Sequence, residues 1–183
     1  MKSYTVGIAG PSSSGKSTLA VRLARDLGED CCHVLCLDSY LVKSLGEMVS
    51  PISQKAYHDF SNPVYLDLEQ VLREIDTQAK KSRYLIVEGL SVLYFPQLRQ
   101  RLNLKLFLTA DPELRLYRRI LRNTNRQDGS TVRSVGEYHL HSASIQESKY
   151  ILPTRVYSDL ILDGGYLTDL GVALLVDFLR QQG

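Results

Sequence analysis

Apolar residues along this chain fall into two patterns that alternate from one end to the other. Five short segments are nearly continuous in apolar, β-branched or aromatic residues, which is typical of strands buried on both faces of a sheet. These segments are YTVGIA (4–9), HVLCLD (33–38), YLIVEG (84–89), LKLFLT (104–109) and SDLILD (158–163).

Between these segments, apolar residues recur at the three- and four-residue spacing of an amphipathic helix. The repeating positions are Leu19, Leu23 and Leu27; Leu68, Val71, Leu72 and Ile75; Leu114, Ile120 and Leu121; and Leu170, Leu174, Leu175 and Phe178. Strands that alternate with helices predict parallel strands joined by right-handed crossovers. We therefore expect an α/β fold with a doubly wound, parallel five-stranded sheet in a single domain, residues 1–183. Ligands of such sheets bind beyond the carboxyl ends of the strands.

The first expected strand runs directly into GPSSSGKST, residues 10–18, which matches the phosphate-binding pattern G-x-x-x-x-G-K-[ST] in full. Its glycines let the backbone curl so that N–H groups point at phosphate oxygens, and the following helix adds its positive end. Lys16 is placed to reach the β- and γ-phosphates, and Ser17 to ligate Mg²⁺. We expect a fold of the P-loop NTPase type that binds ATP and Mg²⁺, although the loop itself does not distinguish ATP from GTP. The expected nucleotide-binding residues are Gly10, Pro11, Ser12, Ser13, Ser14, Gly15, Lys16, Ser17 and Thr18.

Two further expected strands end in a carboxylate. Asp38 closes the second apolar segment, and Glu88 lies at the end of the third. A carboxylate beside a phosphate loop can take the proton of an attacking hydroxyl and help to hold Mg²⁺. We interpret Asp38 as a base and metal ligand and Glu88 as support for Mg²⁺. The alternatives are a helix N-cap for Asp38 and an ordinary polar strand end for Glu88.

The segment after the fourth expected strand, ADPELRLYRRILRNTNRQDGSTVR, is dense in arginine. Arg115, Arg119 and Arg122 share one helical face by their spacing. Arginines on a closing flap neutralise the charge that phosphoryl transfer spreads over phosphate oxygens, and the flap excludes water. Such a run is also typical of a solvated helix face, but beside a phosphate loop we interpret residues 115–133 as a lid. Its other arginines are Arg118, Arg126 and Arg133.

Composition excludes several classes of protein. Hydrophobic residues make up 44% of the 183 residues and charged residues 23%, and the net charge of +2 gives no reason to expect a nucleic-acid or membrane partner. The N-terminus has too short an apolar run for a signal peptide, and no stretch approaches a membrane span, so we expect a cytoplasmic protein.

Cys31, Cys32 and Cys36 are an odd number on one apolar segment and are expected to be reduced. A metal site of these cysteines with His33 is disfavoured because neighbouring strand side chains face opposite ways.

The motifs in this order resemble the uridine kinase family of P-loop kinases, which is related to phosphoribulokinase and pantothenate kinase. The resemblance extends over nearly the whole chain. GPSSSGKST is similar to the family's P-loop, LGEDCCHVLCLDSY to its approach to the acceptor-side acidic motif, and LIVEGL to the strand that bears its Mg²⁺-supporting Glu. RLYRRILRN resembles the Arg-rich lid helix, and LPTRVYSDLILDGG the closing strand and the turn after it. The P-loop alone is general to many NTPases, whereas the five motifs together are specific.

The resemblance implies an ATP-dependent kinase that moves the γ-phosphate to a hydroxyl of a small metabolite. Asp38 is implied to be the catalytic base, and Arg119 and Arg122 to close over ATP. The implied catalytic residues are Asp38, Lys16, Arg119 and Arg122; the implied metal ligands are Ser17, Glu88 and Asp38; and the implied acceptor ligands are Tyr40 and Asp59.

Three departures from the family pattern concern the acceptor and the lid. In DFSNPVYLD, Ser61 and Asn62 replace an Asp and a His, so that Asp59 is the candidate for a ribose-binding carboxylate and His58 for a border of the pocket. The family's β-hairpin between the second helix and the third strand, which carries the Tyr and His that read a pyrimidine, is missing, because only KKSR separates helix from strand. The lid sequence Glu-Arg-Gly-Arg is replaced by RQDG.

These departures leave the acceptor open. A nucleoside such as uridine or cytidine is the leading hypothesis. The alternatives are a kinase for a non-nucleoside alcohol, such as a sugar, a pantothenate-like compound or a vitamin riboside, and a nucleotide-dependent regulatory ATPase. The sequence contains no guanine-reading N-K-x-D, which argues against a GTPase. The expected partner is a small hydroxyl compound, and a homo-oligomer is left open.

Overall fold

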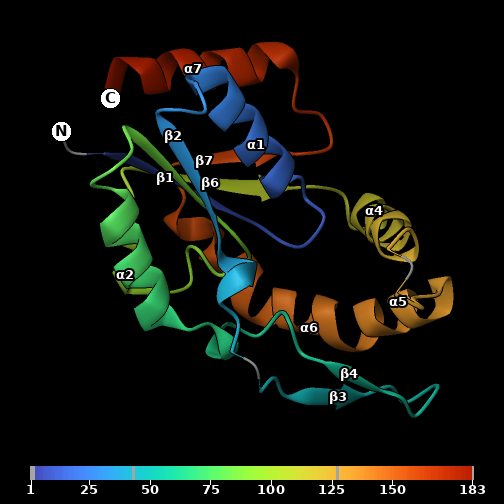
Figure 1. Cartoon of the computed structure of the whole chain (residues 1–183). Helices are drawn as coiled ribbons and strands as arrows, with labels where there is room; N and C mark the ends of the chain where they lie inside the picture. The colour runs from blue at the N-terminus through green and yellow to red at the C-terminus, as the bar shows by residue number, and fades with distance from the viewer. Residues whose placement is uncertain (1–2, 43, 127, 183) are drawn as a thin grey trace.

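The structure is a computed structural model that describes residues 3–42, 44–126 and 128–182. Its centre is a parallel sheet of five strands in the order β2-β5-β1-β6-β7, as the alternating apolar segments predicted (Figure 1). The strands are β1 (Tyr4–Ala9), β2 (Cys32–Cys36), β5 (Tyr84–Glu88), β6 (Leu104–Thr109) and β7 (Leu160–Asp163). The strand that leads into the phosphate loop, β1, is therefore the middle strand of the sheet.

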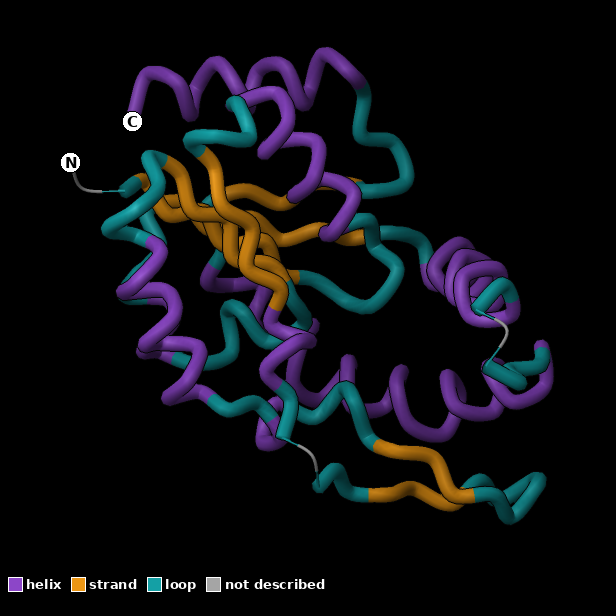
Figure 2. Tube along the Cα trace, viewed as in Figure 1, coloured by secondary structure: helices purple, strands orange, loops and turns teal. Residues whose placement is uncertain are grey.

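Helices cover both faces of this sheet (Figure 2). One face carries α1 (Lys16–Leu27) and α7 (Asp169–Gln182), and the other carries α2 (Leu68–Gln78) and the short α3 (Pro96–Arg99). Ile8 packs in the first of the two apolar layers and Ala9 in the second, because successive side chains of a strand point to opposite faces. Both residues are fully buried, which explains why the strand segments read as continuous apolar runs.

The last helix, α7, buries a different face from the one its spacing predicted. Of the four predicted positions, Leu170, Leu174 and Phe178 are exposed by 69%, 62% and 42%, and Leu175 is buried. The face toward α1 is formed by Leu175 with Val172, Val176 and Leu179. Both sets follow a three- and four-residue spacing, so periodicity alone does not choose between them. Packing against α1 decides which set of residues is buried. Within the described ranges, no helix is both long and apolar enough to cross a membrane.

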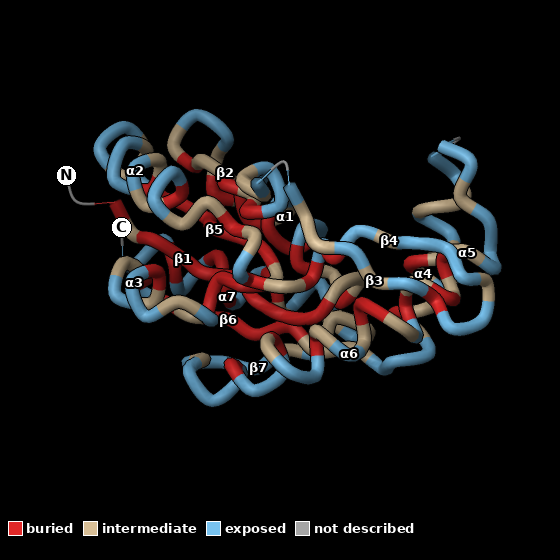
Figure 3. Tube along the Cα trace, turned by 90° about the horizontal axis from the view of Figure 1, so that it is seen from below, coloured by how far each residue is buried: buried red, intermediate tan, exposed pale blue. Residues whose placement is uncertain are grey.

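The segments that leave the carboxyl ends of β2 and β6 form a second region beside the sheet (Figure 1). After β2 comes an antiparallel hairpin of β3 (Glu47–Val49) and β4 (Ala56–His58), and after β6 come α4 (Pro112–Thr124) and α5 (Val132–Tyr138). Much of this region is exposed, in contrast to the buried strands of the sheet (Figure 3). From α5 the chain continues through a π-helical turn (His139–Ala143), α6 (Ser144–Gln146), a second π-helical turn (Glu147–Ile151) and a 3-10 helix (Leu152–Tyr157); two further 3-10 helices are Leu37–Tyr40 and Pro63–Tyr65.

The register of the sheet brings the predicted polar strand ends together. Glu88 lies opposite Ile8 of β1 on one side and Cys36 of β2 on the other. The phosphate loop starts directly after β1, and Asp38 lies two residues beyond β2. Parallel strands therefore deliver the loop and both carboxylates to one edge of the sheet, where ligands of such folds bind.

Candidate active site

The P-loop has the curled backbone that phosphate binding requires. Gly10, Ser13 and Gly15 have φ angles of 141°, 63° and 100°, so three residues of the loop lie in the left-handed region. Gly15 precedes α1 without any side-chain cap, which leaves the first N–H groups of this helix directed out of its N-terminus. The ammonium of Lys16 is buried and donates to the carbonyl of Pro11 at 2.9 Å. Burial lowers the pKa of Lys16, and the nearby carboxylates of Glu88 and Asp38 oppose that effect.

The loop also fits a polyphosphate by the polar atoms that it leaves unused. The hydroxyl oxygens of Ser13 and Ser14 are buried and have no hydrogen-bond partner among the described residues. Buried hydroxyls without a partner are costly, and they are rare in folded proteins. A bound nucleotide would supply phosphate oxygens to these hydroxyls, to the free N–H groups of α1 and to Lys16. The P-loop residues therefore fit ATP.

The turn after β7 supports the P-loop from the side. The backbone of Gly164 lies so close that a Cβ there would meet the carbonyl oxygen of Ser14 at 1.8 Å. Arg118 of α4 donates to the carbonyl oxygen of Gly164 at 3.2 Å and to that of Ser13 at 3.5 Å. Arg118, expected as a lid arginine, and Gly164, in the turn after the closing strand, thus hold the loop in place, a contact that the sequence did not indicate.

We expect Gly164→Ala to lower kcat/KM for ATP by about 10²-fold, because a methyl group at this position pushes the P-loop away from the phosphates and small misplacements of a reacting group carry penalties of that order. Steady-state kinetics with ATP as the varied substrate measure the change. Gly136→Ala on α5 is the matched control, since a Cβ there meets nothing within 4 Å. Equal kinetics for the two variants would contradict the proposed close contact between the turn and the loop.

Two of the three residues predicted to hold Mg²⁺, Ser17 and Glu88, are in direct contact. The hydroxyl of Ser17 donates to a carboxylate oxygen of Glu88 at 2.9 Å, and Glu88 is buried. Asp38 is exposed and lines the same cleft. Among residues 3–42, 44–126 and 128–182 no group of three or more His, Cys, Asp or Glu side chains has the geometry of a metal cage. Ser17 and Glu88 offer a hydroxyl and a carboxylate oxygen, and oxygen ligands are the kind that Mg²⁺ takes, together with waters and phosphate oxygens.

The cysteines lie in β2 and in the turn before it, and only Cys36 is at the carboxyl edge of the sheet. Cys31, Cys32 and Cys36 are all free thiols. Burial raises the pKa of Cys32 to about 12, and burial followed by the nearby Glu88 raises that of Cys36 to about 12. Both thiols are therefore protonated at neutral pH and behave as small apolar residues.

The arginines of α4 divide into separate roles, which corrects the expectation of one lid face. Arg115 and Arg119 are buried and both bind Glu147, at 2.7 Å and 3.2 Å. Arg115 does not line the cleft and has a structural position. Arg119 lines the cleft with its guanidinium 5.4 Å from the centre of the Tyr138 ring, and its buried Nη1 finds no hydrogen-bond partner in the described part of the chain. Arg122 also lines the cleft, and burial together with Arg119 and Arg126 lowers its pKa.

Glu147 joins this arginine pair to the P-loop. One of its carboxylate oxygens accepts the backbone N–H of Ser12 at 2.9 Å as well as Arg119, and the other accepts Arg115. Its side chain is only 1% exposed. Glu147 carries no signal in the sequence, because nothing in its neighbourhood distinguishes it from other glutamates of a helical segment.

Asp38 lines a cleft of about 1270 Å³ that is also lined by the P-loop and by Arg118, Arg119 and Arg122. On the side away from the P-loop, the cleft is lined by Val42, Leu45, Tyr57, His58, Phe60, Ser61 and Tyr138. Tyr40 and Asp59, the two expected acceptor ligands, are not among the described residues of this lining. Tyr40 packs against the apolar layer on the α2 face, and buried Asp59 accepts hydrogen bonds from Gln146 at 2.7 Å and from the N–H of Ser61 at 3.3 Å.

Comparisons with known proteins find one matching family model, similar sequences and similar solved structures. The sequence model of a family described as an AAA domain matches residues 6–138. A protein of Clostridium novyi named uridine kinase is 27% identical over 99% of this chain and 97% of its own length. Two solved structures share the fold: a shikimate kinase from Bacteroides thetaiotaomicron (TM-score 0.58, 17% identity, 98% of this chain and 97% of that chain) and a possible uridine kinase from Bacillus stearothermophilus (TM-score 0.56, 16% identity, 89% and 90%).

Proposed function

This chain belongs to the AAA domain family of P-loop proteins, and from that premise we propose that it transfers the γ-phosphate of ATP to a hydroxyl group of a nucleoside. The chain is an ATP-dependent kinase, and its relatives confirm the likeness to uridine kinases that the motifs predicted. The observation that carries the proposed reaction is the position of Asp38. Its carboxylate faces the same cleft as Lys16 and the Ser17–Glu88 pair.

In the proposed reaction Asp38 accepts the proton of the acceptor hydroxyl while the oxygen attacks the γ-phosphorus in line. Lys16 and the guanidinium groups of Arg119 and Arg122, which line the cleft, stabilise the negative charge on the transferred phosphoryl group. Ser17, Glu88 and Asp38 would hold Mg²⁺, which neutralises charge on the β- and γ-phosphates when bound. We place the enzyme in the cytoplasm and assign it uridine or cytidine as acceptor.

A coupled assay of ADP formation tests this proposal. Uridine, cytidine, adenosine, ribose, fructose, shikimate and pantothenate are each supplied with ATP and Mg²⁺, and ADP formation without acceptor is the baseline. We expect fast turnover, on the order of 1–100 s⁻¹, with a pyrimidine nucleoside and a low baseline. A baseline that no acceptor raises would favour a regulatory ATPase, and a selective response to a compound without a nucleobase would favour a kinase for another alcohol.

A further inference from the structure

The β3–β4 hairpin lies between Asp38 and α2, at a different place in the chain from the hairpin that the uridine kinase pattern would have between α2 and β5. Glu47 pairs with His58, Met48 with Tyr57, and Val49 with Ala56. A hairpin with strands this short is not stable in water without further contacts. Its docking onto the rest of the molecule is therefore what keeps it in place.

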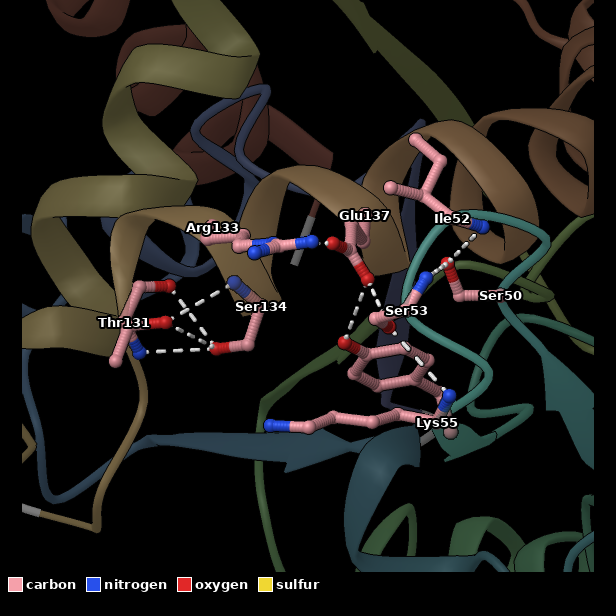
Figure 4. A network of polar contacts seen from close by, with 9 residues as sticks. Ser50, Ile52, Ser53, Lys55, Thr131, Arg133, Ser134 and Glu137 are labelled. Carbon is pink, nitrogen blue, oxygen red and sulfur yellow. Dashed lines mark hydrogen bonds and ion pairs between the residues drawn. The ribbon is translucent and has the colours of Figure 1, made fainter.

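Glu137 of α5 provides that docking (Figure 4). Its carboxylate accepts the hydroxyl of Ser53, in the turn of the hairpin, and the hydroxyl of Tyr57 at 3.3 Å. Arg133, one helical turn earlier on α5, donates to the same carboxylate at 2.8 Å. The Glu137 side chain is only 6% exposed. The hydrogen bonds from Ser53 and Arg133 lower its pKa to about 2, so it is ionised at neutral pH.

The docked hairpin completes a row of aromatic rings. The rings of Tyr57 and Tyr138 are 6.1 Å apart, those of Phe60 and Tyr138 6.4 Å, and those of His58 and Phe60 6.0 Å. All four side chains line the cleft that contains Asp38. Phe60 is nevertheless 49% exposed, which leaves much of a large apolar ring without a protein partner. Aromatic side chains of this kind supply rigid contact area for a flat ligand.

We propose that this aromatic surface, formed by Tyr57, His58, Phe60 and Tyr138, binds the acceptor through a flat aromatic ring, and that the β3–β4 hairpin is the acceptor-recognition element of this chain. The inference rests on the proposed function, because the hydroxyl of the bound acceptor must reach Asp38. Both features lie in one cleft, so a molecule with a ring at one end and a hydroxyl at the other can meet them together. Nucleosides have that form, whereas sugars and shikimate have no flat aromatic ring to stack.

Glu137 has the role of a positioning residue in this arrangement. It lies behind the aromatic surface, where it holds Tyr57 by its hydroxyl and the turn of the hairpin by Ser53. Arg133, the last residue of the expected lid, and Glu137 both belong to α5, so the hairpin is tied to the helix in which the expected lid ends. Loss of Glu137 should therefore weaken acceptor binding with little effect on ATP.

Calorimetric binding of uridine to the ADP-loaded protein tests the aromatic surface without requiring turnover. We expect Phe60→Ala to weaken uridine binding at least about tenfold, the order of the loss when one aromatic side chain that stacks on a base is removed. Tyr117→Ala is the matched control, because Tyr117 is an aromatic residue on α4 that is 60% exposed and does not line the cleft. Equal uridine affinity in the Phe60→Ala variant and the wild type overturns the inference, as does failure of the wild type to bind uridine, cytidine and adenosine.

The coupled assay separates this outcome from failure of the proposed function. If Phe60→Ala leaves uridine turnover unchanged, the aromatic surface does not bind the acceptor, and the proposed nucleoside kinase activity still stands. If Phe60→Ala weakens uridine binding but the wild type phosphorylates no nucleoside, the aromatic surface binds the ring and the proposed reaction is wrong.

Tyr57→Phe and Glu137→Ala test the docking contact, since the first keeps the ring and removes only the hydroxyl that Glu137 accepts. We expect both to raise the KM for uridine, Glu137→Ala by about tenfold, while the KM for ATP and kcat at saturating uridine stay near those of the wild type. Glu137→Gln should restore part of the loss, because an amide oxygen still accepts from Ser53 and Tyr57. An equal rise in both KM values would show a merely structural role for Glu137, and circular dichroism checks that each variant is folded.

Discussion

The Asp38→Asn variant is expected to lose phosphotransfer by about 10²–10⁴-fold, the contribution typical of a positioned general base, while its affinity for ATP stays close to that of the wild type. Asparagine has nearly the shape of aspartate, but its amide cannot take the proton of the acceptor hydroxyl. Asp38 is exposed in the cleft, so the exchange leaves the core unchanged. Single-turnover transfer to uridine measures the chemical step, and calorimetry measures ATP binding.

Asp30→Asn is the control for this experiment, because Asp30 is an exposed aspartate in the turn before β2 and away from the cleft lining. We expect wild-type kinetics for it. Undiminished turnover in Asp38→Asn would show that Asp38 is not the general base. A loss of ATP binding as large as the loss of turnover would show that Asp38 acts in nucleotide binding.

Glu147→Gln is expected to have the largest effect on stability. Glu147 is the partner of two buried arginines, and removing one partner of a buried ion pair typically lowers the free energy of unfolding by about 3–5 kcal/mol, because the remaining charges stay buried without compensation. The variant should also raise the KM for ATP, since an amide accepts the N–H of Ser12 less strongly than a carboxylate does. Urea unfolding with and without ADP measures both effects.

The matched control is Glu69→Gln. Glu69 pairs with Arg73 on the exposed side of α2, where the two side chains are 87% and 68% exposed. An exposed pair of this kind contributes about 0–1 kcal/mol. Similar losses for the two variants would contradict the assignment of Glu147 as the buried link between α4 and the P-loop.

The nucleotide half of the site could be predicted because its signals are local. Gly10 and Gly15 permit positive φ angles, and Lys16 and Ser17 follow within the same turn. Apolar runs on either side indicate the strand and helix that hold the loop. The carboxylates also followed from short-range reasoning, because parallel strands bring their carboxyl ends to one edge wherever the sheet order places them.

Helical spacing alone did not predict the contacts of the α4 arginines. Helical spacing correctly put Arg115 and Arg119 on one face of α4. Their partner, Glu147, lies 32 and 28 residues farther along the chain. The same spacing was therefore compatible with a solvated face, a lid, or the buried ion pair that the structure contains.

The sequence did not indicate the β3–β4 hairpin, which lines part of the cleft. The strands β3 and β4 have three residues each, too few for an alternating pattern to stand out. Tyr57 and Glu137 lie 80 residues apart, and their contact forms only when the hairpin folds against α5. The prediction that no hairpin lies between α2 and β5 is confirmed, but nothing in the sequence indicated the β3–β4 hairpin.

Short-range patterns were sufficient for the strands, the P-loop and the kind of chemistry at the edge of the sheet, because backbone geometry and side-chain periodicity act over a few residues. The three-dimensional fold decided which face of α7 is buried, which arginines face the cleft, and which aromatic rings meet beside Asp38. Each of those outcomes depends on contacts between segments far apart in the chain. Such contacts select among local arrangements of similar free energy, and that selection occurs only when the whole chain packs.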